Sequence, residues 1–245
     1  MSTASRPLEP TVPVVAPDVD VVAPRPAGHV AGWAHSAGKR ALDVAVALPL
    51  AVLTLPVLVV MCAVSAAVFR ANPLFTQDRI GRDGSRFRFV KLRSLSPVVP
   101  ADIDKYALAA QPLSPWGRFV RSTHLDELPQ LWSVLSGRMS LVGPRPELPA
   151  IAATFDPEFV RRRTLVRPGV TGLWQVGDGA AGLIGESPEF DDLYLRAASL
   201  RLDLWTLVRT VSSAAGRDPA TIEDCRRAAG LGDGPAAGAA PSSER

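Results

Sequence analysis

Cysteine is scarce in this chain of 245 residues, which contains Cys62 and Cys225 and no other. The two show no paired spacing, so the sequence excludes a disulfide framework and a cysteine-based metal cluster. A reducing, cytoplasmic setting fits this composition. The N-terminal region lacks a basic start followed directly by an apolar core, which excludes a signal peptide. No internal repeat is evident.

Charge is absent from residues 44–69, which form one apolar run with basic residues on both flanks. A straight helix of this length would measure roughly 39 Å, enough to cross a hydrocarbon core about 30 Å thick. Two features argue against a simple crossing. Pro49 and Pro56 interrupt the run, and the two basic flanks give the positive-inside rule no orientation to select. From the residues alone, a plain span and a helix that dips in and returns to the same face both stay open.

The apolar run divides the chain into four expected parts. Residues 1–37 are rich in proline without periodicity and predict a disordered leader. Residues 38–70 form the membrane element, and residues 71–213 form one folded domain. Residues 214–245 predict a mostly disordered tail with a short helix around 220–229. No second apolar run of comparable length follows, so the folded domain is expected on one side of the membrane.

A small hairpin and several helices are expected after the apolar run. Strands near residues 74–75 and 87–90 flank residues 81–84, which contain the strong turn signal Asp-Gly. The other expected elements are a helix from Asp156 and Pro157 to about residue 163, a loop over 167–176 and a helix over 189–211. The expected fold class is therefore α+β and helix-rich, as a single membrane-associated domain.

Two adjacent carboxylates, Asp126 and Glu127, stand where an apolar helix is expected to begin. Apolar residues recur with helical spacing up to about residue 137. Proline is tolerated only in the first turn, so Pro129 predicts Asp126 as the N-cap or first helical residue. There a carboxylate faces unpaired N–H groups, which keep it ionised and oriented for attack on phosphorus. For an isolated Asp-Glu pair, an ordinary helix cap is the simpler interpretation.

Seven motifs occur in a fixed order between residues 39 and 211. They are Lys39-Arg40 with Asp43; Gln77, Arg79 and Gly81; Lys91-Leu92-Arg93-Ser94; Gly117-Arg118 with Arg121; Leu125-Asp126-Glu127-Leu128-Pro129-Gln130-Leu131; Ser140-Leu141-Val142-Gly143-Pro144-Arg145-Pro146-Glu147; and Arg167-Pro168-Gly169-Val170-Thr171-Gly172-Leu173-Trp174-Gln175. With these motifs the chain resembles the bacterial sugar transferase family, the monotopic phosphoglycosyl transferases that begin lipid-linked glycan assembly.

The resemblance implies a covalent, two-step transfer. Asp126 would attack the sugar-bearing phosphate of a nucleotide diphosphate sugar, expected to be a UDP-sugar, and release the nucleoside monophosphate. A polyprenyl phosphate such as undecaprenyl phosphate would then displace Asp126 and form a polyprenyl diphosphate sugar. Glu127 would assist, and Mg²⁺ held by Asp126 and Glu127 would act on the diphosphate.

Arginines are the expected phosphate ligands, because planar guanidinium forks match phosphate oxygens. Arg93 and Arg145 are the leading candidates, with Lys91 from the same motif as Arg93. Pro144 and Pro146 fix the backbone on either side of Arg145, so its side chain is aimed with little entropy to lose.

Further site residues follow from the same motifs. For Arg118 and Arg121, contact with phosphate or headgroups and a solvated pair stay equally open. Trp174 and Gln175, with Glu147 and the two prolines beside Arg145, are assigned to the nucleotide or sugar pocket. Trp174 as an ordinary core residue is an equal alternative.

The family's membrane element is a re-entrant helix broken at a Ser-Pro, and Pro56 lies at the matching distance after Asp43. A re-entrant helix broken at Pro56 is therefore expected here. Lys39 and Arg40 would anchor it at the interface, with Asp43 beside them. Leu55-Pro56 replaces the Ser-Pro, so a capping bond from that serine is missing.

A second departure is Gly177-Asp178-Gly179, where many members carry Ser-Gly-Arg, which puts an arginine contact there in doubt and bears on donor choice. Longer members carry extra membrane helices and another domain before the catalytic part, so the chain is expected to be the minimal form. The catalytic domain is expected on the cytoplasmic face of the cytoplasmic membrane. Its expected partners are the two substrates and membrane lipids, without nucleic acid, and a homodimer is left open.

Two other functions compete with the enzyme. An inactive homologue could anchor other glycan-assembly proteins, but both dyad carboxylates and Arg145 are present. A channel or transporter subunit is disfavoured by the single apolar element and the large charged remainder.

Overall fold

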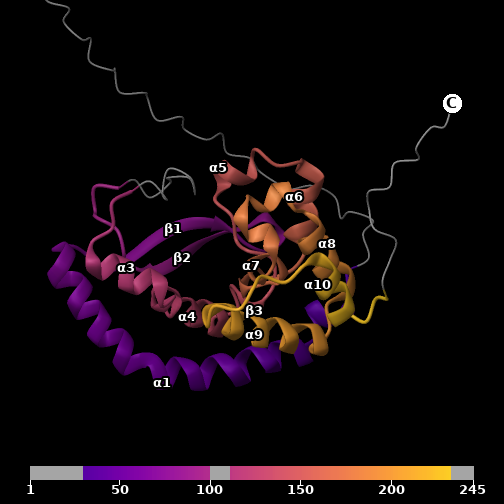
Figure 1. Cartoon of the computed structure of the whole chain (residues 1–245), viewed down its shortest axis with the longest axis horizontal. Helices are drawn as coiled ribbons and strands as arrows, with labels where there is room; N and C mark the ends of the chain where they lie inside the picture. Colours follow the sequence, from indigo (N-terminus) through magenta and orange to yellow (C-terminus); the bar gives the residue numbers. More distant parts are fainter. Residues whose placement is uncertain (1–29, 100–110, 233–245) are drawn as a thin grey trace, which may run out of the picture.

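The computed structural model describes residues 30–99 and 111–232 (Figure 1). Its longest element is α1 (Ala37–Phe69), which Ser36 caps by accepting a hydrogen bond from the Lys39 N–H at 3.0 Å. By length and composition, α1 is a candidate membrane helix. The expected leader and the end of the expected tail lie largely outside the described residues.

The helix α1 runs without interruption through Pro49 and Pro56, so the break expected at Pro56 is not found. It curves along its length instead (Figure 1). Each proline lacks an N–H and its ring displaces the carbonyl one turn earlier, which bends a helix. The Thr54 hydroxyl donates to the Leu50 carbonyl at 2.6 Å in the same stretch, and such bonds also favour bending.

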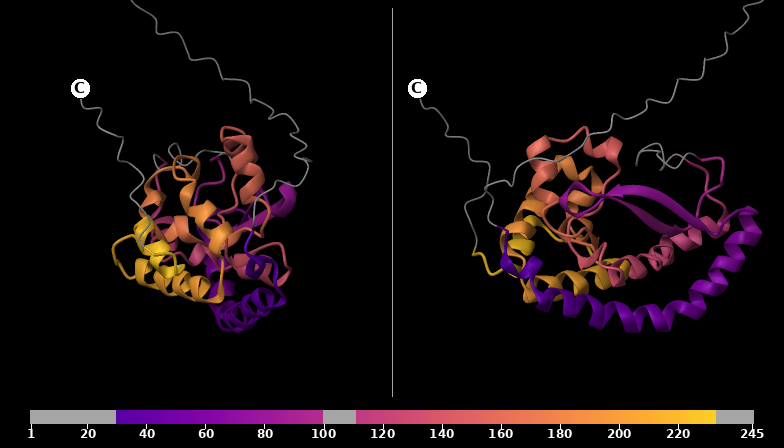
Figure 2. Two further views of the ribbon diagram at one scale, coloured as in Figure 1. Left: turned by 90° about the vertical axis from the view of Figure 1, so that its right-hand side faces the viewer. Right: turned by 180° about the vertical axis from the view of Figure 1, so that it is seen from behind.

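Both ends of α1 are attached to the rest of the protein, whereas its middle is not. Buried positions recur every four residues over residues 39–51, and Met61 and Ser65 are buried near the other end. Between them, Leu53 is 75% exposed. A cavity of about 510 Å³, lined in part by Trp132, separates the middle of α1 from the protein body. The helix therefore extends along one side of the molecule (Figure 2).

The predicted hairpin is confirmed as β1 (Leu74–Ile80) and β2 (Arg86–Leu92), joined through η2 (Arg82–Gly84). At this turn Asp83 has φ of 56°, a left-handed conformation that Asp tolerates better than most residues. In the antiparallel register Phe75 lies opposite Lys91, and Arg79 lies opposite Phe87. Opposed residues share a face, so Arg79 and Lys91 lie on the same side of the hairpin.

A second sheet pairs β3 (Ser140–Val142) with β4 (Gly169–Thr171) in parallel. The strand β4 lies inside the segment that the sequence predicted as a loop. Its close approach to the chain after β3 requires glycine, since a Cβ on Gly169 would lie 2.2 Å from the Gly143 nitrogen. The main core surrounds this sheet and includes Leu141, Leu173 and Leu202.

Short helices surround the second sheet, so the fold is α+β and helix-rich as predicted. The helices are α3 (Pro115–Ser122), α4 (Gln130–Leu135), α5 (Pro149–Ala152), α6 (Pro157–Arg163), α7 (Leu173–Val176), α8 (Glu189–Ala197), α9 (Leu200–Ala214) and α10 (Ile222–Ala228), with 3-10 turns η1 (Gly32–His35), η3 (Leu125–Glu127), η4 (Asp178–Ala181) and η5 (Ile184–Glu186).

Capping side chains explain where several helices start. Asp156 accepts a hydrogen bond from the Phe159 N–H at 2.8 Å, which confirms the predicted start of α6. The helix expected near residues 220–229 is α10. The single helix expected over 189–211 is wrong, because Ser199 begins a new helix by accepting from the Leu202 N–H at 3.2 Å.

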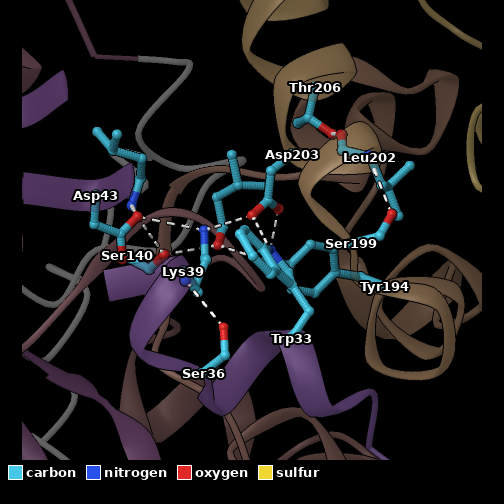
Figure 3. Close-up of polar contacts among 12 residues, drawn as sticks. Trp33, Ser36, Lys39, Asp43, Ser140, Tyr194, Ser199, Leu202, Asp203 and Thr206 are labelled. Atoms are coloured by element: carbon cyan, nitrogen blue, oxygen red, sulfur yellow. Dashed lines mark hydrogen bonds and ion pairs between the residues drawn. The ribbon is translucent and has the colours of Figure 1, made fainter. Parts of the chain in front are cut away.

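A buried ion cluster joins the start of α1 to the core (Figure 3). The Lys39 Nζ lies 3.3 Å from Asp43 Oδ1 and 3.0 Å from Asp203 Oδ2, and Asp203 belongs to α9. Asp43 Oδ1 also accepts hydrogen bonds from the Ser140 hydroxyl and the Leu141 N–H, each at 3.0 Å. The cluster therefore connects α1, β3 and α9.

Two aromatic side chains complete the cluster around Asp203. The Trp33 indole N–H donates to Asp203 Oδ2 at 2.7 Å, and the Tyr194 hydroxyl lies 3.0 Å from Oδ1. Lys39 is 3% exposed and Asp43 is fully buried, so the expectation that they lie at the lipid interface is wrong. Both are held inside the protein because each has an oppositely charged partner.

Arg40, the third expected anchor, also contacts protein. Its guanidinium donates to the carbonyls of Val134 and Leu135 at 2.6 and 2.8 Å. These carbonyls belong to the last residues of α4, where a cation is favoured. Pro56 lies in the exposed middle of α1.

Asp203→Ala is expected to lower the free energy of unfolding by about 3–5 kcal/mol, since it removes one partner from a buried ion cluster. Thermal unfolding of the detergent-solubilised protein would measure the loss. Asp218→Ala is the control, because Asp218 is exposed and such a change is expected to cost under about 0.5 kcal/mol. Equal melting temperatures for the two variants would contradict the structural role given to the cluster.

Candidate active site

Asp126 and Glu127 lie on η3, a 3-10 turn that precedes α4. The N-cap of α4 is Pro129, so the prediction that Asp126 caps this helix is wrong. His124 adopts φ of 56° before the turn, and its carbonyl accepts a hydrogen bond from the Glu127 N–H at 3.1 Å. The two carboxylates are thus fixed by a separate tight turn.

Lys91 on β2 is the counter-ion of both carboxylates. Its Nζ lies 2.8 Å from Glu127 Oε1 and 3.9 Å from Asp126 Oδ2. The ammonium also lies 5.5 Å from the centre of the Phe89 ring, a cation–π distance. Lys91, expected from the sequence as a phosphate ligand, therefore already has carboxylate partners.

The two carboxyl groups have pKa values shifted in opposite directions. Burial raises the pKa of Asp126, and Lys91 offsets part of this effect while Glu127 adds to it. Burial would also raise the pKa of Glu127, but Lys91 and Arg145 outweigh it, so this pKa is lowered. A more basic carboxylate is a better nucleophile, and the nearby ammonium still favours its ionised form. Asp126 is therefore the better suited of the two to attack phosphorus.

Two cavities meet at this turn. The Asp126 cavity, of about 150 Å³, is lined by Asp126 together with Lys91, Arg93 and Arg121. The Gln175 cavity, of about 540 Å³, is lined by Glu127 at one end and by residues of α7 and α9 at the other. Arg79 and Arg145 line both cavities. The two arginines therefore place two guanidinium groups where the cavities meet.

The backbone around Arg145 is held by hydrogen bonds to four successive carbonyls. The bonds run from the Gly169 N–H to the Pro144 carbonyl at 2.8 Å, from Arg163 Nη2 to the Arg145 carbonyl at 2.8 Å, from Arg79 Nη1 to the Pro146 carbonyl at 2.8 Å, and from the Ile80 N–H to the Glu147 carbonyl at 2.9 Å. Within residues 30–99 and 111–232, no side chain bonds the Arg145 guanidinium. A fixed backbone with an uncommitted guanidinium is pre-organised for an anion.

Arg163 is a buried support for this turn that the sequence did not single out. Its Nε lies 2.8 Å from Asp191 Oδ2, and both side chains are almost fully buried. In the sequence it belongs to a run of three arginines, which is typical of a solvated surface. A signal was available, because the third residue of the run falls on the same face of α6 as the buried Val160.

Arg79 is a second residue that the sequence marked only as part of a motif. It lies 3.8 Å from Glu147 Oε2 and 5.3 Å from the centre of the Phe89 ring. Burial, with Arg145 nearby, lowers the pKa of Arg79 to about 10, so it stays charged at neutral pH. Strand periodicity could have placed it, since Arg79 and Lys91 share a face of the hairpin.

The remaining predicted residues divide between the two cavities and the surface. Arg121 faces the Asp126 cavity, whereas Arg118 is exposed, donates to the Leu113 carbonyl at 3.1 Å and lines neither cavity. Arg93 lines the Asp126 cavity and donates to the Asn72 carbonyl at 2.7 Å.

The residues assigned to a nucleotide or sugar pocket lie around the other cavity. Glu147, Trp174 and Gln175 line the Gln175 cavity. Pro144 and Pro146 are buried on either side of Arg145 and do not line the Gln175 cavity. Sequence reasoning missed the contribution of α9, whose Thr210 and Ser213 also line the cavity, because the packing of α9 against β4 cannot be read from local sequence signals.

Asp126 and Glu127 offer carboxylate oxygens, the ligands that Mg²⁺ prefers. In the described part of the chain, no three or more His, Cys, Asp or Glu side chains form a cluster that could hold a metal ion. Mg²⁺ in phosphoryl-transfer enzymes needs less from the protein, since one or two carboxylates suffice when substrate phosphates supply further oxygens. Asp126 and Glu127, adjacent and oxygen-only, fit that pattern.

Comparisons with known proteins agree with the motifs. The model of the family described as Bacterial sugar transferase matches residues 34–217. A UDP-galactose-lipid carrier transferase from Erwinia amylovora is 36% identical to this chain over 74% of it and 41% of that protein. Proteins named UDP-glucose:undecaprenyl-phosphate glucose-1-phosphate transferase from Caulobacter vibrioides and Klebsiella pneumoniae are 35% and 34% identical, over 83% and 71% of this chain and 79% and 39% of theirs. The chain spans about two fifths of the Erwinia and Klebsiella proteins.

Lys91→Met is expected to raise the pKa of Asp126 further, because it removes the nearest cation that favours the ionised form. Lys91→Arg keeps the charge and serves as the control. Carbon-13 NMR of protein labelled at the aspartate carboxyls would follow the titration, with Asp126→Asn identifying the signal. An unchanged titration midpoint in Lys91→Met would contradict the counter-ion role.

Proposed function

Because this chain belongs to the bacterial sugar transferase family, we propose that it transfers a sugar-1-phosphate from a UDP-sugar to undecaprenyl phosphate. The observation that carries the proposal is the Asp126 carboxylate, which faces a cavity also lined by the uncommitted Arg145 guanidinium. A carboxylate nucleophile and cations for phosphate oxygens are the two requirements of covalent phosphoryl transfer. The names of the relatives support the two substrate classes.

In the first step, an Asp126 oxygen attacks the sugar-bearing phosphorus. A new O–P bond forms, and the bond from this phosphorus to the oxygen bridging the two phosphates breaks, so that UMP leaves with the electron pair. Arg145 and Arg79 line the cavities on both sides of the reacting phosphate and offset the charge that develops there. The attacking carboxylate is already ionised, so no general base is needed.

In the second step, a phosphate oxygen of undecaprenyl phosphate attacks the phosphorus bound to Asp126. The P–O bond to Asp126 breaks, the carboxylate returns to its starting form, and undecaprenyl diphosphate sugar is released. When bound by Asp126 and Glu127, Mg²⁺ would neutralise diphosphate charge. Lys91 holds Glu127 in place beside the nucleophile.

We further propose that α1 enters and leaves the membrane from the same face. Its two ends are both docked to the folded domain, whereas a helix that crosses the bilayer has its ends on opposite sides. The exposed apolar middle, which includes Leu53 and Val60, faces lipid in this arrangement. We place the domain on the cytoplasmic face, in keeping with the free thiols of Cys62 and Cys225.

Asp126→Asn is expected to lower the turnover of UDP-sugar by at least about 10³-fold, because it removes the nucleophile. UMP release in nanodiscs that contain undecaprenyl phosphate would measure it. Without the acceptor, mass spectrometry should find a phosphosugar on Asp126 of the wild-type protein. Asp78→Asn, on the exposed face of β1, should turn over normally. Wild-type turnover by Asp126→Asn would refute the mechanism.

The same-face arrangement of α1 is tested by labelling single cysteines in a Cys62→Ser, Cys225→Ser background. Ala41→Cys and Arg70→Cys, which are exposed near the two ends of α1, should both react with a water-soluble maleimide from the same side of sealed vesicles. Leu53→Cys, in the apolar middle, should resist labelling. Reaction of Ala41→Cys and Arg70→Cys from opposite sides would show that α1 spans the membrane.

A further inference from the structure

The far wall of the Gln175 cavity carries polar groups that the proposed chemistry does not use. Gln175 from α7 and Ser213 from the end of α9 form this wall together with Thr210. The Thr210 hydroxyl donates to the Thr206 carbonyl at 2.8 Å and lies 2.7 Å from the Thr171 hydroxyl, so it is occupied within the protein. These bonds also fix α9 against β4 and make the wall rigid.

The polar side-chain atoms of Gln175 and Ser213 differ from Thr210, because no described residue pairs with them. Both Gln175 amide atoms, Nε2 and Oε1, and the Ser213 Oγ are buried, and none has a hydrogen-bond partner among residues 30–99 and 111–232. Buried polar groups in native proteins are nearly always paired, because an unpaired one forfeits its bonds to water. Three such atoms on one wall of a 540 Å³ cavity therefore point to a ligand that pairs with them.

The charge of the cavity sets what that ligand can be. Four charged residues line the cavity: Arg79 on β1, Glu127 on η3, and Arg145 and Glu147 in the segment that follows β3. The remainder of its lining is neutral and largely apolar, with Ile151, Leu183 and Ile184 among the side chains. A ligand that fills the cavity thus has an anionic end at the arginines and a neutral, hydrogen-bonding end at Gln175.

The geometry of in-line displacement indicates which part of the nucleotide sugar occupies the Gln175 cavity. The attacking and leaving oxygens lie on opposite sides of the phosphorus. Asp126 lines one cavity and is absent from the lining of the other, and Arg145 lines both. A phosphate bound at Arg145 and attacked from Asp126 therefore expels its leaving group toward the Gln175 cavity. The leaving group is the nucleotide.

We propose that Gln175 and Ser213 bind the pyrimidine base of the nucleotide sugar. This inference rests on the proposed function for the order of the donor's parts. A primary amide presents a donor and an acceptor side by side. The uracil edge offers an N3–H donor beside a carbonyl acceptor, so Gln175 can pair with it through two hydrogen bonds. The Ser213 hydroxyl can donate to the other carbonyl oxygen of the base.

The test measures binding of UMP alone to the full-length protein in detergent, by calorimetry. Gln175→Leu is expected to weaken UMP by about tenfold to hundredfold, the effect of losing a bidentate pair. Ser213→Ala should weaken it by a smaller factor. Ser212→Ala is the matched control, because the Ser212 hydroxyl donates to the Arg209 carbonyl within α9 and does not line the cavity.

A ligand analogue gives the same test without a mutation. UMP methylated at N3 lacks the donor, so it should bind the wild-type protein about as weakly as UMP binds Gln175→Leu. Against Gln175→Leu the methyl group should cost little more, since the partner is already absent. Additive losses from methyl group and mutation would overturn the pairing.

Two other results would also overturn the proposal. One is wild-type affinity of Gln175→Leu for UMP. The other is a changed ratio of kcat/KM for UDP-glucose against UDP-galactose in Gln175→Leu, which would place the sugar at this wall. Binding does not require turnover, so the two proposals fail separately. A wild-type protein that binds UMP but releases none from UDP-sugars would refute the transfer reaction and leave the base site standing.

Discussion

The structure depends on the ion cluster of Lys39, Asp43 and Asp203. A lysine buried to this extent is tolerated only because two carboxylates surround it, and an unpaired charge there would cost several kcal/mol, on the order of 3–5. The partners come from distant parts of the chain, at the start of α1 and in α9. Asp43 also binds the backbone of β3. One cluster thus places the membrane helix, the strand before Arg145 and the helix that walls the Gln175 cavity.

A short stretch of chain joins this cluster to the proposed catalytic site. The strand β3 leads directly into residues 144–147, the segment that contains Arg145. The carbonyls of this segment accept hydrogen bonds from Arg79, Arg163 and two backbone N–H groups. The turn η3, which carries Asp126 and Glu127, is held separately by its own backbone hydrogen bonds and by Lys91. The proposed nucleophile, Asp126, and the proposed phosphate ligand, Arg145, therefore stand on two independently fixed turns. Such pre-organisation suits a reaction that relies on positioning and charge.

The sequence predicted those features whose signals are local. The Asp-Gly turn of the hairpin and the Asp156 cap of α6 need only neighbouring residues, and both are confirmed. The motifs also located the dyad and Arg145 at a common site. The prediction that the helix breaks at Pro56 was wrong, because a helix whose two ends are docked can bend at a proline without ending.

Features that depend on distant partners could not be read in this way. Lys39 and Asp43 stand beside an apolar run, so the sequence favoured a position at the membrane interface. Their burial depends on Asp203, which lies far along the chain. The same holds for Arg163, whose partner Asp191 sits on another helix. The far wall of the Gln175 cavity needed α9 to be seen packed against β4.

The central claim is that one carboxylate carries the sugar phosphate between two half-reactions. Isotope exchange tests it most directly, with labelled UMP and unlabelled UDP-sugar incubated with the protein in the absence of any polyprenyl phosphate. A covalent intermediate predicts that label enters UDP-sugar, since UMP can attack the phosphosugar on Asp126 and reverse the first step. Exchange that occurs only when polyprenyl phosphate is present would contradict the account and indicate direct transfer between the two substrates.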